Sequence, residues 1–145
     1  VMKLLNIVGP DVVTFGRKDA QQVAVIRKMM RDLNVPASIE LIDTIREHDG
    51  LAMSSRNVYL TPDDRRVALT ISSALRAARE LRRSGGSLGE STNQLRRELS
   101  PAIKVDYADI VDPDTFRLAE DEAGPALAIV AGSVGNARLI DNMEV

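Results

Sequence analysis

The sequence predicts a mixed α/β fold, with a parallel α/β layer over residues 1–44 and a small α+β domain over residues 45–145. Three observations lead to this prediction. Helix-like and strand-like segments alternate through the first 44 residues, which is typical of parallel α/β layers. Two amphipathic helices are then expected between residues 61 and 100. Three β-like runs separated by Gly and Pro follow, and they favour a small antiparallel sheet backed by the two helices.

The composition excludes several classes of protein. The 145 residues carry 19 Lys and Arg against 21 Asp and Glu, for a net charge of -2, so we expect no nucleic-acid partner. The chain has no cysteine and a single histidine, His48, so disulfides, thiolate ligands and Ser–His chemistry are not expected, nor is a metal site of its own. No apolar run approaches the roughly 18–20 residues of a membrane span, and no secretory signal opens the chain. We therefore expect a cytoplasmic protein with no membrane partner.

Four elements are predicted within the first 44 residues. Apolar side chains at helical spacing cover residues 1–8, and Gly9-Pro10 ends that helix. Residues 11–15 are rich in β-branched side chains and are expected to form a buried strand. A helix over residues 18–33 and a strand over residues 38–42 follow. The apolar face of this second helix consists of Val23, Ile26, Met30 and Leu33.

The beginning of the chain lacks a helix start signal. Residue 1 is Val, and no Ser, Thr, Asp or Asn precedes the first helix as a cap. One interpretation is a processed or frayed N-terminus. The interpretation we prefer is that the chain is the C-terminal part of a longer protein. In that case we expect an exposed apolar face on the first helix and strand, because the rest of the sheet would lie elsewhere in the polypeptide.

Two helices are predicted after a polar loop at residues 43–60. Thr61 as a cap and Pro62 at the first helical position, with two acids behind them, predict a long helix that ends near the glycines of residues 84–87. A shorter helix with three aligned leucines follows. These leucines are Leu88, Leu95 and Leu99. Both helices therefore present one apolar face to a common core.

The last third of the chain is β-like. Its strand-like segments are residues 103–107, the continuous apolar run 126–131, and residues 137–142, which mix Leu and Ile with Arg and Asp. In the first segment Ile103, Val105 and Tyr107 alternate with polar residues, which predicts that they share one face of a strand. The acidic stretch Glu120-Asp121-Glu122 is expected to be a solvated loop.

The first cluster of candidate functional residues is residues 15–22 (Phe-Gly-Arg-Lys-Asp-Ala-Gln-Gln), where a strand is expected to end and a helix to begin. Ligands bind beyond the carboxyl ends of strands in open α/β sheets, and helix N-termini favour anions. Gly16 would allow a ligand to approach the backbone, and Lys18 adds a positive charge. On a helix Lys18, Asp19 and Gln22 would share a face and look into one cleft. The alternative is that Lys18 and Asp19 are ordinary residues of a solvated first turn.

The second cluster is residues 53–57 (Met-Ser-Ser-Arg-Asn), in the loop before the long helix. The hydroxyls of Ser54 and Ser55 and the guanidinium of Arg56 suit a phosphate, because they supply neutral and charged hydrogen-bond donors side by side. The alternative is a loop of small polar residues with an exposed arginine.

Taken together, residues 15–22 and 45–57 closely resemble two characteristic stretches of the pantothenate synthetase (pantoate–β-alanine ligase) family, and residues 3–8 and 138–142 resemble its flanking segments. Members of that family are about twice this length. Their N-terminal domain is a Rossmann-like nucleotidyl-transferase domain related to class I aminoacyl-tRNA synthetases, and a smaller C-terminal domain closes over the site. The resemblance implies that residues 1–44 are the end of the Rossmann-like domain and that residues 45–145 are the closing domain. It also implies a homodimer.

The resemblance implies a two-step reaction that consumes ATP. The carboxylate of pantoate attacks the α-phosphate of ATP, giving pantoyl adenylate and pyrophosphate, with Mg²⁺ bound to the nucleotide. The amine of β-alanine then attacks the acyl carbon, and pantothenate and AMP are released. Such chemistry depends mostly on positioning and on cations that stabilise phosphate charge.

Roles for individual residues also follow from the resemblance. Lys18 and Arg56 would be the catalytic cations, Ser54 and Ser55 would hydrogen-bond the phosphates, and Gln22 would bind pantoate. The 53–57 loop resembles the mobile phosphate-clamping loop of the synthetases. Because the first cluster would lie on one domain and this loop on the other, closure of the domains would act as a gate. The residues expected to line the ATP pocket are Gly16, Arg17, Lys18, Asp19, Ile45, Met53, Ser54, Ser55 and Arg56.

The chain departs from the family pattern in three places. Arg17 stands where an acid is usual, Ala20 stands where an aromatic residue is usual, and the N-terminal His-x-Gly-His motif of the family is absent. We therefore expect the chain to hold half an active site and to be inactive alone. Two other functions fit the same residues, namely a non-catalytic nucleotide-binding or dimerisation module derived from this fold, and an adenylating enzyme for another acid.

Overall fold

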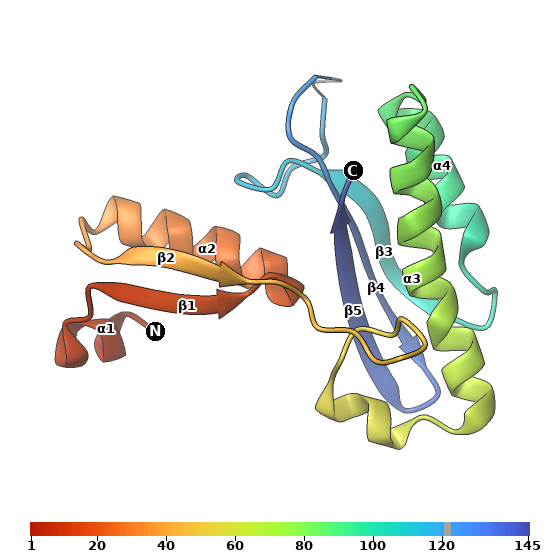
Figure 1. Ribbon diagram of the computed structural model, residues 1–145, viewed down its shortest axis with the longest axis horizontal. Helices are drawn as coiled ribbons and strands as arrows, with labels where there is room; N and C mark the ends of the chain where they lie inside the picture. The colour runs from red at the N-terminus through yellow and green to blue at the C-terminus, as the bar shows by residue number, and fades with distance from the viewer. Residues whose placement is uncertain (121–122) are drawn as a thin grey trace.

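Two lobes lie side by side in the computed structural model, which describes residues 1–120 and 123–145 (Figure 1). The first lobe holds α1 (Met2–Val8), β1 (Val12–Gly16), α2 (Ala20–Asp32) and β2 (Ser38–Ile42). The second lobe holds α3 (Pro62–Arg83), α4 (Leu88–Glu98), β3 (Lys104–Val111), β4 (Leu127–Val134) and β5 (Ala137–Glu144). Two short 3-10 helices, η1 (Arg17–Asp19) and η2 (Ser55–Tyr59), lie between these elements. The mixed α/β prediction is confirmed at this level, although residues 121 and 122 of the acidic stretch lie outside the described residues.

The first lobe is a two-stranded parallel sheet with helices. Strands β1 and β2 pair in register from Val12 opposite Ser38 to Gly16 opposite Ile42. The prediction that β1 is buried is wrong, because its residues alternate between exposed and half-buried. Val13 and Phe15 pack against the core of the first lobe, whereas Val12, Thr14 and Gly16 are exposed, so only one face of the strand is covered by the described residues.

Helix α2 is amphipathic as predicted, with one exception. Val23, Ile26 and Met30 are buried, but Leu33 is 57% exposed. The α-helix ends at Asp32, so Leu33 lies beyond the last turn and outside the apolar face. Helix α2 also begins later than predicted, because residues 17–19 form η1.

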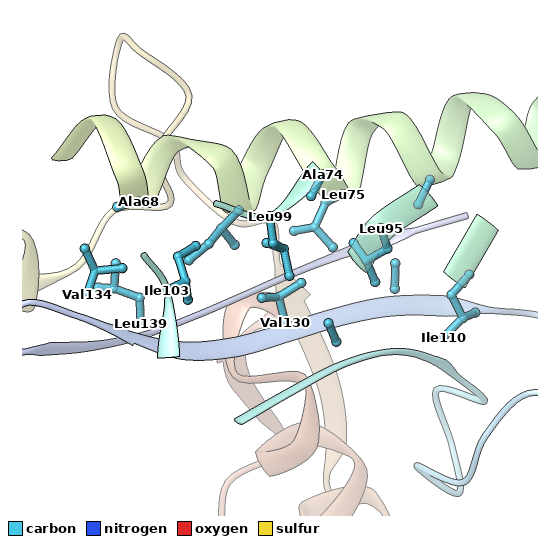
Figure 2. Close-up of a cluster of buried hydrophobic side chains, with 14 of the residues drawn as sticks. Ala68, Ala74, Leu75, Leu95, Leu99, Ile103, Ile110, Val130, Val134 and Leu139 are labelled. Atoms are coloured by element: carbon cyan, nitrogen blue, oxygen red, sulfur yellow. The ribbon is translucent and has the colours of Figure 1, made fainter. Parts of the chain in front are cut away.

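The second lobe packs two helices on one face of a three-stranded antiparallel sheet, as predicted. The strand order is β3-β4-β5, and α3 begins with a capping box in which Thr61 and Asp64 exchange hydrogen bonds. Figure 2 shows Leu75 of α3 and Leu95 of α4 pointing toward Val130 at the centre of the sheet. All three side chains are fully buried.

A β-bulge in β3 redirects one predicted side chain. The register with β4 shifts between Val105 and Tyr107, so Tyr107 does not share the face of Ile103. Ile103 packs in the helix-covered core, whereas Tyr107 packs on the opposite face of the sheet. Ala20, the first residue of α2, packs on that same opposite face. The back of the sheet is therefore where the first lobe docks on the second.

Candidate functional site

The two clusters that the sequence singles out meet at the boundary between the lobes. The ammonium of Lys18 donates a hydrogen bond of 3.0 Å to the backbone carbonyl of Met53. The two residues are 35 positions apart in the sequence, and they belong to the 15–22 cluster and the 53–57 loop. The fold thus makes one site of both.

Gly16 ends β1 two residues before Lys18. The strand ends at Gly16, and the three-residue helix η1 follows immediately. Gly16 has a φ of -77°, which any residue can adopt, and a Cβ added there would meet nothing within 4 Å. The fold of the described residues therefore does not require glycine at this position, and it leaves open space beside the backbone.

A small pocket opens beside Lys18. It has a volume of about 210 Å³ and lies between the start of α2 and the back of the sheet. Lys18, Asp19 and Gln22 line it from the first lobe, and Arg138 and Asp141 line it from β5. A cation, an acid and an amide from the 15–22 cluster thus share one pocket with a second cation and a second acid, so the pocket offers hydrogen-bond donors and acceptors of both charges.

The ammonium of Lys18 lies in a mixed electrostatic environment. Partial burial lowers its pKa below the ordinary value of 10.5, while the carboxylates of Asp19 and Asp141 raise it and Arg56 lowers it further. The net direction is downward, so Lys18 releases its proton at a lower pH than an exposed lysine does.

The 53–57 loop presents its donors toward solvent near β5. The hydroxyl of Ser54 caps η2 by accepting a hydrogen bond of 3.2 Å from the backbone N–H of Arg56. Because that hydroxyl acts as an acceptor here, its proton is free for another partner. One guanidinium nitrogen of Arg56 donates to the backbone carbonyl of Arg138 at 3.2 Å. The side chains of Ser55 and Arg56 are exposed.

A network of polar side chains braces this loop against α3. The amide of Asn57, a buried residue, donates to the carboxylate of Glu47 at 2.6 Å and to the carbonyl of Ala52 at 3.1 Å. Arg65 of α3 forms ion pairs with Glu47 at 2.6 Å and with Asp49 at 2.7 Å. Hydrogen bonds from Asn57 and then Arg65 lower the pKa of Glu47. These contacts hold the backbone of the 53–57 loop, which carries the exposed donors, in place against α3.

Arg17 does not join Lys18. Its guanidinium forms ion pairs of 2.9 Å with both Asp43 and Glu144. It lines a larger cavity of about 540 Å³, whereas Lys18 lines the smaller one. The structure therefore directs adjacent residues of η1 into different cavities.

The remaining predicted residues lie near the site with their side chains exposed. Ile45 and Met53 are 62% and 53% exposed, and the carbonyl of Ile45 accepts a hydrogen bond of 2.9 Å from the N–H of Met53. Gln22 is exposed and lines the smaller pocket. His48, for which no site role was predicted, is exposed in its loop.

Several polar residues at the site were not assigned a role from the sequence. These residues are Arg46, Arg138, Asp141 and Asn142. All four lie within the stretches that resemble the family, which was the one available signal. Their chemistry depends on partners about a hundred residues away, which no local pattern reveals.

The described residues hold no cluster of three His, Cys, Asp or Glu side chains able to bind a metal ion. Within the same residues, no helix is long and apolar enough to cross a lipid bilayer.

Comparison with known proteins gives consistent matches along the chain. The family model described as "Pantoate-beta-alanine ligase" matches residues 1–144. The chain is 49% identical over 148 residues to pantothenate synthetase from Heliobacterium modesticaldum, covering 100% of this chain and 53% of that protein. The chain spans about half the length of the curated relatives it matches.

Solved structures agree with the sequence comparison. The crystal structure of pantothenate synthetase from Thermus thermophilus matches with a TM-score of 0.93 and 43% identity, covering 99% of this chain and 52% of that one. The pantoate–β-alanine ligase from Francisella tularensis, solved in complex with "Beta-gamma ATP" and β-alanine, matches with a TM-score of 0.67 and 30% identity. That match covers 99% of this chain and 47% of the other.

Proposed function

The chain belongs to the pantoate–β-alanine ligase family, and from this premise we propose that it is the C-terminal portion of an ATP-dependent ligase that joins pantoate and β-alanine. The observation that carries the proposal is the contact between Lys18 and the carbonyl of Met53. It places the cation of the 15–22 cluster against the loop that offers Ser54, Ser55 and Arg56. Such a group of donors suits the phosphates of ATP.

In the first step, the carboxylate of pantoate attacks the α-phosphorus, and the bond to pyrophosphate breaks. Negative charge moves onto the phosphate oxygens, and the site supplies cations where that charge develops. Lys18 would exchange its contact with Met53 for a phosphate oxygen. Arg56 uses one nitrogen on the carbonyl of Arg138, so its remaining N–H groups are available for a second phosphate. Ser54 and Ser55 would donate neutral hydrogen bonds.

In the second step, the amine of β-alanine attacks the acyl carbon of pantoyl adenylate, the bond from that carbon to the AMP oxygen breaks, and the amine loses a proton as the amide forms. Gln22, which lines the smaller pocket, would act earlier, in the first step, by hydrogen-bonding pantoate and holding its carboxylate near the nucleotide. Asp19 and the open space beside Gly16 would accommodate the nucleotide itself, next to the backbone of Ile45 and Met53. We leave Arg17 out of this phosphate site, because its guanidinium pairs with Asp43 and Glu144 and lines the other cavity.

Mg²⁺ would accompany ATP and would bind to its phosphate oxygens. The side chains proposed for the phosphates do not suit a metal ion of their own, because Lys18 and Arg56 are cations and Ser54 and Ser55 are neutral. The described residues also hold no cluster of three His, Cys, Asp or Glu side chains able to bind one. Bound to the nucleotide, Mg²⁺ would neutralise part of the phosphate charge.

The exposed apolar surface of the first lobe supports placement in the C-terminal half of a longer ligase. Parallel sheets are almost always covered on both faces, yet this one has two described strands and leaves large apolar residues of its elements exposed. These residues include Leu4, Ile7, Val8, Val12 and Ile42. We propose that residues 1–44 are the end of a Rossmann-like domain and that residues 45–145 are the domain that closes over the site. Homodimer assembly, a cytoplasmic location and the inactivity of the chain alone remain parts of this proposal.

The exchange of labelled pyrophosphate into ATP tests the first step. It should be measured with the full-length polypeptide that contains this segment, with pantoate and with a panel of other carboxylic acids. We expect exchange that requires pantoate, and formation of pantothenate once β-alanine is added. Exchange that requires a different acid would identify an adenylating enzyme of another specificity. No exchange with any acid, from a folded protein, would favour the non-catalytic module.

A further inference from the structure

One strand of the second lobe contacts both halves of the candidate site. The contacts come from residues 138–142 of β5. The carbonyl of Arg138 accepts a hydrogen bond from Arg56, the carboxylate of Asp141 accepts one from Arg46, and the side chain of Asn142 donates to the carbonyl of Lys18. Building on the proposed function, we infer that Asn142 and Asp141 are positioning residues that hold Lys18 at a fixed place relative to the 53–57 loop.

Asn142 anchors the turn that presents Lys18. Asn142 is buried, with 9% of its surface exposed. Its side-chain amide nitrogen donates to the backbone carbonyls of Arg17 at 3.0 Å and of Lys18 at 2.8 Å. The helix η1 has three residues and no side-chain cap of its own. An amide carries two N–H donors, one for each carbonyl, so asparagine fits this position and a carboxylate would face two acceptors.

Asp141 anchors the segment that leads into the 53–57 loop. Its carboxylate, 4% exposed, forms a two-pronged ion pair with Arg46 at 2.7 and 3.0 Å. Arg46 also donates to the carbonyl of Gly50 at 3.1 Å and pairs with Ala52 in an isolated antiparallel bridge. The loop beyond Ala52 therefore begins from a point fixed to β5.

These contacts make β5 the common support of groups that come from both lobes. Lys18 belongs to the first lobe, whereas β5 and the 53–57 loop belong to the second. If the support is lost, Lys18 can move relative to the loop while the donors of the loop keep their own contacts. Phosphoryl chemistry is sensitive to such displacement, since a misplacement of about 1 Å can cost about 100-fold in rate.

The substitution Asn142→Asp gives the sharpest test, because it keeps the size of the side chain and replaces its donors with acceptors. In the full-length protein we expect kcat for pyrophosphate exchange to fall by about 100-fold, with a much smaller change in the KM for ATP. Asn142→Ala, which adds no charge, should lower kcat in the same direction. The matched control is Asn93→Asp on α4, an exposed asparagine, and it should leave kcat unchanged.

A double variant separates positioning from general damage to the fold. Because Asn142 acts through Lys18, adding Asn142→Asp to Lys18→Ala should cause little further loss of exchange. Multiplied losses, or wild-type kcat in Asn142→Asp, would overturn the inference.

Chemical labelling of Lys18 gives a readout that does not depend on catalysis. The rate at which acetic anhydride modifies Lys18, followed by mass spectrometry, should rise several-fold in both Asn142 variants and stay constant in Asn93→Asp. If the wild-type protein shows no exchange, the proposed function fails and labelling alone decides the positioning role. An unchanged labelling rate in both Asn142 variants would contradict that role.

Discussion

The two lobes bury their apolar residues to different extents. In the second lobe, one core joins both helices to all three strands, and Leu75, Leu95 and Val130 within it are fully buried. In the first lobe, the buried residues of the core are Leu5, Ile26 and Met30, while apolar side chains of similar size, such as Leu4 and Ile7, are exposed. The second lobe has the larger buried core, whereas the first lobe leaves more of its large apolar side chains exposed.

This difference bears on how the site works. Lys18 comes from the first lobe, which has the smaller core, whereas the 53–57 loop and β5 come from the second lobe, which has the larger core. Asn142 donates to the backbone of η1 across the boundary. The second lobe therefore serves as the frame against which the position of Lys18 is set.

The largest expected effect on stability comes from the core of the second lobe. Leu75→Ala removes a side chain with 0% exposure, so it should lower the free energy of unfolding by about 3 kcal/mol. Leu4→Ala, at a residue 64% exposed, should cost less than about 0.5 kcal/mol in the 145-residue chain. Urea unfolding of both variants measures this contrast, and equal losses would contradict the distinction between the lobes.

The same Leu4→Ala variant sharpens the comparison in a longer polypeptide. If preceding chain covers α1, the loss there should rise to about 2 kcal/mol or more. A loss that stays near zero would argue against a covering segment.

The next effect concerns how the helices begin. The hydroxyl of Thr61 caps α3, whereas α1 has no side-chain cap. Thr61→Ala should therefore destabilise the second lobe by about 1 kcal/mol. Ser73→Ala, at an exposed position within α3, is the control and should change the unfolding free energy by less than about 0.5 kcal/mol. Equal losses in the two variants would exclude the cap as the cause.

Acid should weaken the second lobe through its carboxylates. Hydrogen bonds from Asn57 and then Arg65 lower the pKa of Glu47, and the backbone N–H of Ser87 lowers that of Glu90. The native state then binds fewer protons than the unfolded state, so the stability from these groups is present above the ordinary value of 4.5 and is lost as pH falls below it.

Hydrogen exchange across this acid range measures where the loosening occurs. We expect the backbone amides of α3 to exchange faster as pH falls below about 4.5, after correction for the intrinsic pH dependence of amide exchange. Arg65→Gln should reduce the pH dependence, because Glu47 loses one of its donors. An identical pH dependence with and without Arg65 would contradict this assignment.

The smallest effect on stability is expected at Gly16. A Cβ there meets nothing within 4 Å, so Gly16→Ala should change the unfolding free energy by less than about 0.5 kcal/mol. In the full-length protein the KM for ATP should rise, because the added methyl group occupies space that the proposal gives to the nucleotide. Gly89→Ala on α4, a glycine with equally open surroundings, is the control. An unchanged KM for ATP in Gly16→Ala would remove Gly16 from the site.

Local features of the fold were predictable because their causes lie within a few residues. The Thr61 and Pro62 start of α3 and the strand at residues 38–42 follow from capping and alternation, and both are confirmed. The exposure of Leu33 and the reversed direction of Tyr107 were not predicted. They depend on where a helix ends and on a register shift with a partner strand.

In the candidate site, too, local features were predictable from the sequence and long-range contacts were not. Residue types and spacing identified the 15–22 and 53–57 clusters, and the structure brings Lys18 and Met53 together. The outward turn of Arg17 toward Glu144 and the contact of Asn142 with Lys18 span more than 120 residues. Contacts of this range are set by how the lobes pack, so sequence spacing carried no information about them.

The central claim is that Lys18 and the 53–57 loop form one phosphate site, from which Arg17 is turned away. The direct test is pantoate-dependent pyrophosphate exchange by the full-length protein carrying Lys18→Ala or Arg17→Ala. We predict that Lys18→Ala lowers the exchange rate by about 100-fold or more, with a stability loss below about 0.5 kcal/mol, and that Arg17→Ala retains most of the rate. Equal loss in both variants, or full exchange without Lys18, would contradict the account.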